Sequence, residues 1–353
     1  MGALFPPQLR DWQLPAEAAL TPQALRRVSR EAATQTFDAA AEALNEDWGV
    51  SLDGKQIQRW AEAVGRRLVQ DRQLELREAL CGRPPKPPAN APALLVIGLD
   101  GGRVQMREKD AETGSRWRED KVATVTTYLA GDGAEVKPKP LVTTHVGTME
   151  KAEMFGRLAR VEAQRRGLDQ AGQVLVMGDG GNWIDPIVER EFSGAVRILD
   201  YAHASEHAHD CARALHGPES AATARMGDRL EGWMYEGQAE RMIAELETEA
   251  KRLGPPQESD GPEHPRRMLA ANAAYFRKNL AHMNYPEYRR KGWPIGSGNV
   301  EAGIKQFNKR VKGTEQFWQI PGVEAILTLR SLRLSQDQRW QRYWLSRPAY
   351  RPA

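Results

Sequence analysis

The sequence predicts an α/β protein that has a mixed β-sheet and helical segments before and after it. The proline-rich stretch CGRPPKPPANAP, residues 81–92, separates a helical pattern from a strand-like one and marks a linker. After it, the patterns follow in the order β-β-β-α-β-α-β, which is typical of a mixed sheet with helical crossovers. The 353 residues, of which 41% are hydrophobic and 27% charged, are enough for two or three soluble domains.

Residues 1–80 are expected to form a helical domain. Its apolar residues share one face of a helix that ends at Gly49, and a second helix follows, capped by Ser51 or Asp53. Two helices joined at a glycine resemble a helix-turn-helix, a DNA-binding motif. The exposed side chains that would then face the major groove are Lys55, Gln56, Gln58 and Arg59. An ordinary helical hairpin is the alternative.

The strand-like region begins after the linker and continues to about residue 204. Its five predicted strands are contained in ALLVIGLDGG, KVATVTTYLA, KPLVTTHVG, QVLVMGDGGNWI and AVRILDYAHA. Residues 205–290 are predicted to be helical around a central loop, LGPPQESDGPEHP. Residues 291–335 contain a glycine-rich turn and two helices, and residues 336–353 are expected to be a C-terminal tail.

Composition excludes several classes of protein. No apolar run approaches the roughly 18 residues of a membrane span, and the N-terminus lacks the apolar region of a signal peptide, so a cytoplasmic location is expected. The only cysteines, Cys81 and Cys211, exclude a disulfide framework or a four-cysteine zinc site. The net charge is +3, but residues 289–313 hold seven Lys or Arg and one acid. This stretch indicates either a polyanion partner or a solvated helix face.

Two acidic residues stand where apolar runs end. Asp100 follows the first predicted strand and Asp179 the fourth, and each is followed by two glycines. The first and fourth strands of such a sheet are commonly neighbours, so both carboxylates are expected at one edge, where sites form. A divalent cation would relieve their repulsion, and carboxylate oxygens suit Mg²⁺. The alternative is that each Asp-Gly is an ordinary turn.

Glu301 is expected to complete that metal site. It lies in the first turn of a predicted helix, where the helix dipole favours the ionised form. Two metal ions about 4 Å apart would activate an attacking oxygen and stabilise a leaving one. Cations in the same helix are predicted to contact the phosphate backbone: Lys305, Lys309, Arg310 and Lys312.

These stretches together resemble a known family. The motifs GLDGG, MGDGGNWI, LDYAHASEH and GWPIGSGNVEAGIKQ look like those of a bacterial insertion-sequence DDE transposase, of the Kra-type family within the Mutator-like group. The resemblance covers roughly residues 20–345. It implies an RNase H-like core formed by residues 93–204 and 291–335, with residues 205–290 inserted before the last catalytic acid.

The resemblance also implies the roles of site residues. Asp100, Asp179 and Glu301 would be the catalytic triad that binds two Mg²⁺ ions, for which Mn²⁺ can substitute. Asp200 and His203 match an Asp/Cys-x-x-His motif that would support the site or position DNA; a capped helix start with a buried histidine is the alternative. The expected partners are terminal inverted repeats and target DNA in the bacterial nucleoid, bound by a homo-oligomer.

Other functions share some of these features. An RNase H-like nuclease or resolvase would have the same three acids, and a catalytically silent, truncated transposase would only bind DNA. Relatives often carry a cysteine-rich segment upstream, whereas here no cysteine precedes Cys81, so a truncated N-terminus stays an open alternative. Residues 203–207 also spell H-x-x-E-H, an inverted zinc-peptidase signature that leaves the two Asp-Gly-Gly sequences unexplained.

Overall fold

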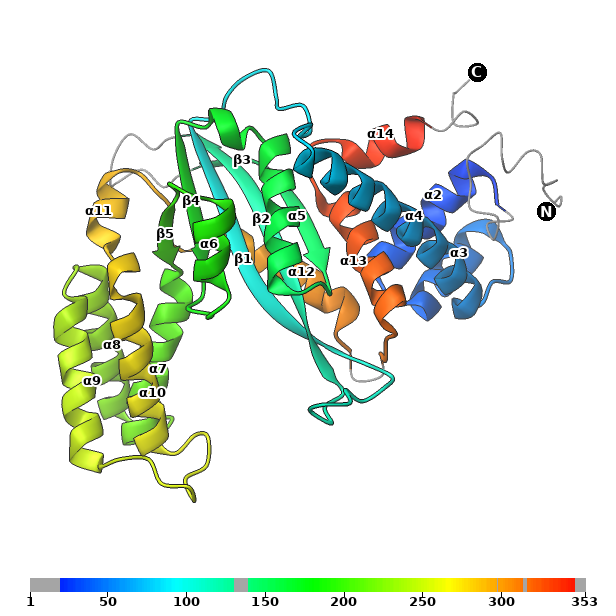
Figure 1. Ribbon diagram of the computed structural model, residues 1–353. Helices are drawn as coiled ribbons and strands as arrows, with labels where there is room; N and C mark the ends of the chain where they lie inside the picture. The colour runs from blue at the N-terminus through cyan, green and yellow to red at the C-terminus, as the bar shows by residue number, and fades with distance from the viewer. Residues whose placement is uncertain (1–19, 130–138, 297, 314–315, 347–353) are drawn as a thin grey trace. The chain divides into compact units, whose positions relative to one another are not determined.

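The computed structural model describes residues 20–129, 139–296, 298–313 and 316–346, with the side chains of residues 298–304 excluded (Figure 1). The chain divides into two compact units. The first comprises Met1–Thr127, Leu141–Ala171 and Asn299–Ala353, and the second comprises Tyr128–Pro140 and Gly172–Gly298.

The central element is a five-stranded sheet in the order β3-β2-β1-β4-β5. This order is that of an RNase H-like core, and the predicted mixed five-stranded α/β sheet is confirmed. The strands span Leu94–Gln105 (β1), Trp117–Leu129 (β2), Lys139–Thr148 (β3), Gln173–Gly178 (β4) and Val196–Leu199 (β5).

Antiparallel and parallel pairs both occur in this sheet. Thr126 of β2 hydrogen-bonds Thr143 of β3 at 3.0 Å, and Thr127 hydrogen-bonds the next residue back, Val142, which is an antiparallel pairing. Strands β4 and β5 are parallel, with a register that runs from Leu175 opposite Val196 to Gly178 opposite Leu199. Parallel strands need a crossover, and α6 (Ile184–Glu191) supplies it.

The helices at the N-terminus form for local reasons that the sequence shows. Thr21 caps α2 (Pro22–Thr34), and Gly49 ends α3 (Phe37–Trp48) with a φ of 61°. Asp53 caps α4 (Gly54–Leu80), and Gln56 completes a capping box with it. The predicted end at Gly49 and the predicted cap at Asp53 are confirmed.

These N-terminal helices share one hydrophobic core with the rest of the first unit. The core joins Leu25 and Ile57 to Val104 of β1 and to Phe307. Gly65 of α4 lies against α13, where a Cβ atom would be 2.3 Å from the Ala325 carbonyl oxygen. The other helices of this unit are α5 (Ala152–Arg165), η1 (Leu168–Gln170), α12 (Gly298–Val311), α13 (Ile320–Leu334) and α14 (Arg339–Leu345).

Two predicted boundaries need correction. Residues 1–80 do not form a separate domain in the part described, because their apolar faces are buried in the common core. The described part of the predicted tail at residues 336–353, which ends at residue 346, is not simply a tail, because α14 buries Trp340 and Trp344 in the same core. A pattern of two tryptophans four residues apart is the signal for this helix.

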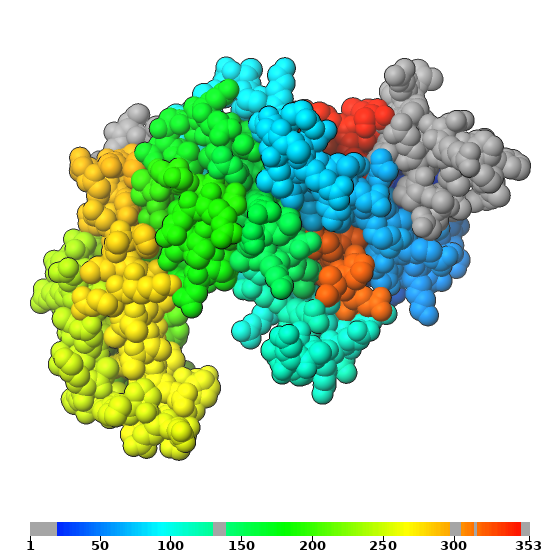
Figure 2. Space-filling view, in the orientation of Figure 1, coloured from blue at the N-terminus to red at the C-terminus, as the bar shows by residue number. Residues whose placement is uncertain are grey.

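A four-helix bundle makes up most of the second unit. Its helices are α7 (Tyr201–His216), α8 (Ala221–Tyr235), α9 (Ala239–Leu253) and α10 (Pro265–Asn279), and Figure 2 shows them packed together in green and yellow. Helix α7 contacts α8 and α10, and α9 also contacts both. The short η2 (Leu280–His282) and α11 (Tyr285–Arg290) follow. The helical character predicted for residues 205–290 is confirmed, although the first helix begins earlier.

Candidate active site and nucleic-acid interface

Asp100 lies within β1 and not at its end. The strand continues to Gln105, so the predicted strand end at Asp100 is wrong, and so is the alternative of an ordinary Asp-Gly turn there. The Asp100 side chain is partly exposed, and its Oδ1 accepts a hydrogen bond from the Gly101 N–H at 2.6 Å. The glycines serve close packing here: a Cβ atom at Gly102 would lie 2.5 Å from Asp120 Oδ1 and 2.8 Å from Asn308 Oδ1.

Asp179 directly follows β4, as predicted. Its carboxylate is partly exposed, and Oδ1 accepts the Gly181 N–H at 3.0 Å. The buried Arg197 donates hydrogen bonds to the carbonyl oxygens of Asp179 and Gly178, at 2.5 and 3.2 Å. Arg197 therefore fixes the backbone from which the Asp179 carboxylate projects.

Glu301 is the fourth residue of α12, in the first turn where the sequence predicts it. Its side chain lies outside the described residues. The later part of the helix is firmly seated, because Phe307 and Val311 are fully buried. Phe307 packs on β3 at Gly147, where a Cβ atom would lie 2.6 Å from its ring.

A buried acid that the sequence did not single out lies where α12 meets the sheet. Asp120 of β2 is fully buried, and neither of its carboxylate oxygens has a hydrogen-bond partner among the described residues. The Asn308 Oδ1 atom has none either, and both residues converge on Gly102, two positions after Asp100. Burial raises the pKa of Asp120 to about 6, against the opposing charge of Lys312.

The predicted DNA-binding residues of α12 divide into two groups. Lys305, Lys309 and Lys312 are exposed, as a phosphate contact requires. Arg310 is only 1% exposed, and its Nε donates to the Ala32 carbonyl oxygen at 2.6 Å. Burial and the nearby Arg330 lower the pKa of Arg310 to about 9. Arg310 is therefore a structural residue, and the prediction that it contacts phosphate is wrong.

The residues of α4 predicted to face the major groove also divide into two groups, exposed and locally hydrogen-bonded. Lys55 and Arg59 are exposed. Gln56 is partly buried, and its Oε1 accepts the Asp53 N–H at 3.0 Å in the capping box. Gln58 donates to Glu62 at 2.6 Å on the same helix. Both glutamine side chains are thus engaged locally, which leaves the two cations as the better candidates for DNA contact.

Asp200 and His203 lie at the start of α7. Asp200 is 1% exposed and caps the helix by accepting the Ala202 N–H at 2.9 Å, so the alternative of a capped helix start is borne out for it. His203 is partly exposed, with Nδ1 3.6 Å from Glu206. A supporting role for the two residues in catalysis stays a prediction.

The H-x-x-E-H sequence forms no evident zinc site. His207 Nδ1 lies 2.7 Å from Asn272 Oδ1, and its ring packs on Tyr275 with the centroids 4.4 Å apart. Among the side chains described, which do not include Glu301, no group of three or more His, Cys, Asp or Glu is placed to hold a metal ion.

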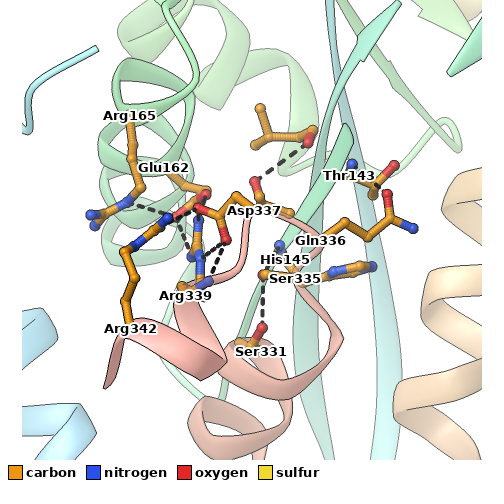
Figure 3. Close-up of polar contacts among 12 residues, drawn as sticks. Thr143, His145, Glu162, Arg165, Ser331, Ser335, Gln336, Asp337, Arg339 and Arg342 are labelled. Atoms are coloured by element: carbon orange, nitrogen blue, oxygen red, sulfur yellow. Dashed lines mark hydrogen bonds and ion pairs between the residues drawn. The ribbon is translucent and has the colours of Figure 1, made fainter. Parts of the chain in front are cut away.

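A second polar site lies in the first unit, beside a cavity of about 350 Å³ lined by β3, α4, α5, α13 and α14. Figure 3 shows the polar contacts of its residues. Arg339 makes a two-pronged ion pair with the buried Glu162, at 2.5 and 3.0 Å, and also binds Asp337 at 2.8 Å. Burial alone would raise the pKa of Glu162, but Arg339 holds it below its usual value. Burial lowers the pKa of the adjacent His145 to about 4, so this imidazole is neutral. The charges are matched within the cavity wall, as in a structural network.

No protein-family model matches the chain, and no curated protein matches it. Among solved structures, the chain is similar to the Drosophila P element transposase strand transfer complex, with 10% sequence identity and a TM-score of 0.38. That similarity covers 91% of this chain and 93% of the other. In the described part of the chain, no helix is both long enough and apolar enough to cross a membrane.

Proposed function

We propose that this protein is a DDE-type transposase of the Kra-type, Mutator-like kind, which cleaves DNA at the ends of its own element and joins them to a target. One observation carries the proposal. Helix α12, which bears Glu301, is seated on β1 and β2 through Asn308 and Gly102, and Asp100 stands two residues before that glycine. An acid-bearing helix and an acid-bearing strand thus belong to one packed unit.

The position of Asp179 in the sheet supports the same proposal. Asp179 directly follows β4, which is the neighbour of β1 in the strand order. This is the arrangement of acids that the family resemblance implies for an RNase H-like core. That all three carboxylates meet at one site is part of the proposal.

The donor set fits a divalent cation. Asp100 and Asp179 offer partly exposed carboxylates, and hard oxygen ligands of this kind suit Mg²⁺ or Mn²⁺. In the proposed mechanism Asp100, Asp179 and Glu301 hold two such ions. When bound, the ions supply activation of the attacking oxygen and stabilisation of the leaving one.

The protein's own residues then bind and orient DNA. Lys305, Lys309 and Lys312 project from α12 into solvent and would hold the phosphates that flank the scissile bond. The reaction would first free a 3′-OH by hydrolysis and then use it to attack target DNA. Joining two ends to one target needs two copies of the site, so we expect a homo-oligomer on DNA.

A cleavage and joining assay tests this function. The wild type and Asp179→Asn are incubated with labelled DNA that carries the element's end, with Mg²⁺ or Mn²⁺. Nicked and joined products that the variant fails to form support the transposase. The matched control is Asp169→Asn, which removes a carboxylate from the short η1 helix of the first unit and should leave both products.

Each other outcome points to a different function. Cleavage without joining indicates the nuclease or resolvase. Specific binding without any product indicates a silent, DNA-binding relative of a transposase.

A further inference from the structure

A pocket rich in arginine lies in the first unit, and none of the candidate catalytic or DNA-binding residues named above lines it. It has a volume of about 590 Å³ and is bordered by α2, the end of α3, the end of α13 and α14. Four guanidinium groups line it, from Arg26, Arg27, Arg30 and Arg333, and we call it the arginine pocket. Among the described residues that line it, none is acidic.

Helix geometry explains why these cations gather. Arg26 and Arg30 are four residues apart on α2 and so share one face, and Arg333 approaches that face from α13. Burial lowers the pKa of Arg333, and the positive charges of Arg30 and Arg26 lower it further against the opposing effect of Glu31. Positive charge is therefore concentrated at this pocket.

Two carboxylates at the edge of the pocket offset part of this charge. Arg27 pairs with Asp47 at 2.6 Å, and Glu31 approaches Arg27 to 3.8 Å and Arg30 to 3.6 Å. The side chains of Arg27, Asp47 and Arg30 are 45%, 50% and 52% exposed, so solvent screens these pairs, and positive charge remains in excess among the described residues. The Nε atom of Arg333 is buried and has no hydrogen-bond partner among the described residues.

The cavity around Glu162 shows what a purely structural arginine cluster looks like in this chain. There, Arg339 has two buried carboxylates as hydrogen-bond partners. The described carboxylates that pair with arginines of the arginine pocket are more exposed, at 19% for Glu31 and 50% for Asp47, and aromatic rings also line the pocket. The Arg333 guanidinium lies 5.7 Å from the ring centre of Trp340, and Trp48 also lines the pocket.

We propose that the arginine pocket binds a phosphodiester group of the DNA backbone. Guanidinium groups match phosphate oxygens in pairs, and the partly exposed ring of Trp48 suits the adjoining sugar or an unstacked base. The site adds a second contact to DNA from the N-terminal helices, besides the lysines of α12. The identity of the nucleic acid as the enzyme's DNA rests on the proposed function, whereas the recognition of phosphate does not.

The test measures DNA affinity of the full chain by fluorescence anisotropy, in EDTA, over a series of salt concentrations. The variant is Arg30→Gln combined with Arg333→Gln, and the control is Arg66→Gln combined with Arg67→Gln, which removes two exposed arginines of α4. Removing one phosphate contact should make the slope of log affinity against log salt shallower by about 0.9. We expect a shallower slope and about tenfold weaker binding at low salt for the pocket variant, and a smaller change for the control.

Other outcomes distinguish the alternatives. Equal slopes for the pocket variant and the wild type would overturn the proposal. If the double variant melts early, Arg26→Gln alone gives the same comparison. Tight binding of inorganic phosphate or ATP that duplex DNA does not displace would identify a free-phosphate site instead. Binding in EDTA is independent of cleavage. If the protein binds DNA through the arginine pocket but never cleaves it with Mg²⁺, the proposed transposase function is refuted while the proposed phosphate contact is supported.

Discussion

Arg310 donates a hydrogen bond from Nε to the carbonyl oxygen of Ala32 at 2.6 Å, across 278 residues of sequence. Ala32 lies in the last turn of α2, where carbonyl oxygens lack partners within the helix. Arg330 of α13 donates to the next carbonyl oxygen, that of Ala33. Positive charge at a helix C-terminus is favourable. The N-terminal helices therefore help to hold α12, the helix that bears Glu301.

This relationship predicts that substitution of two adjacent residues affects different properties, namely stability for Arg310 and DNA binding for Lys309. Arg310→Ala removes a buried donor and opens a cavity, so it should lower the free energy of unfolding by about 2–4 kcal/mol in urea denaturation. Lys309→Ala alters an exposed side chain, so it should change stability by less than about 0.5 kcal/mol but weaken DNA binding at low salt. An equal decrease of stability in both variants would contradict this division of roles.

The buried Asp120 predicts a pH dependence of stability. Its pKa is about 6 in the folded protein against an ordinary value of 3.8, so the folded state binds the proton more tightly than the unfolded state. Stability should therefore fall as the pH rises from about 4 to 6, by at most roughly 3 kcal/mol for this group. Asp120→Asn should remove that fall. Urea denaturation at several pH values checks this, and the same pH profile in both proteins would count against it.

Substitution of Gly102 should impair catalysis without changing the charge of the protein. A Cβ atom there would collide with Asp120 and Asn308, so Gly102→Ala should displace α12 from β1 and abolish metal-dependent cleavage. The control is Gly232→Ala, since a Cβ atom at Gly232 meets nothing within 4 Å. It should keep activity and gain up to about 1 kcal/mol in helix stability. A Gly102→Ala variant that is folded and as active as the wild type would show that the close approach is dispensable.

Local signals in the sequence predicted much of the fold. Gly49, the Asp53 cap and the alternation of strands with helices depend on neighbouring residues, and they appear as predicted. The sequence places the end of β1 at Asp100 because Asp-Gly-Gly resembles a turn, whereas the strand continues and Gly102 admits Asp120 and Asn308.

Long-range contacts account for the other differences. Arg310 follows a basic helical pattern that predicts exposure, and only α2, distant in sequence, buries it. Asp120 lies in the charged run WREDK, where nothing local marks it as buried. The two predicted acids in the sheet are at the expected strands, whereas the proposed site that they form with Glu301 would depend on tertiary contacts that sequence patterns do not encode.

The central claim, that Asp100, Asp179 and Glu301 bind metal together, is tested most directly by Mn²⁺ titration monitored by electron paramagnetic resonance. The titration compares the wild type with Asp100→Asn, Asp179→Asn, Glu301→Gln and the control Asp169→Asn. We expect each of the three variants to weaken Mn²⁺ binding at least tenfold while the control binds like the wild type, because each removes one ligand of a shared site. Wild-type affinity in any one of the three would contradict the shared metal site.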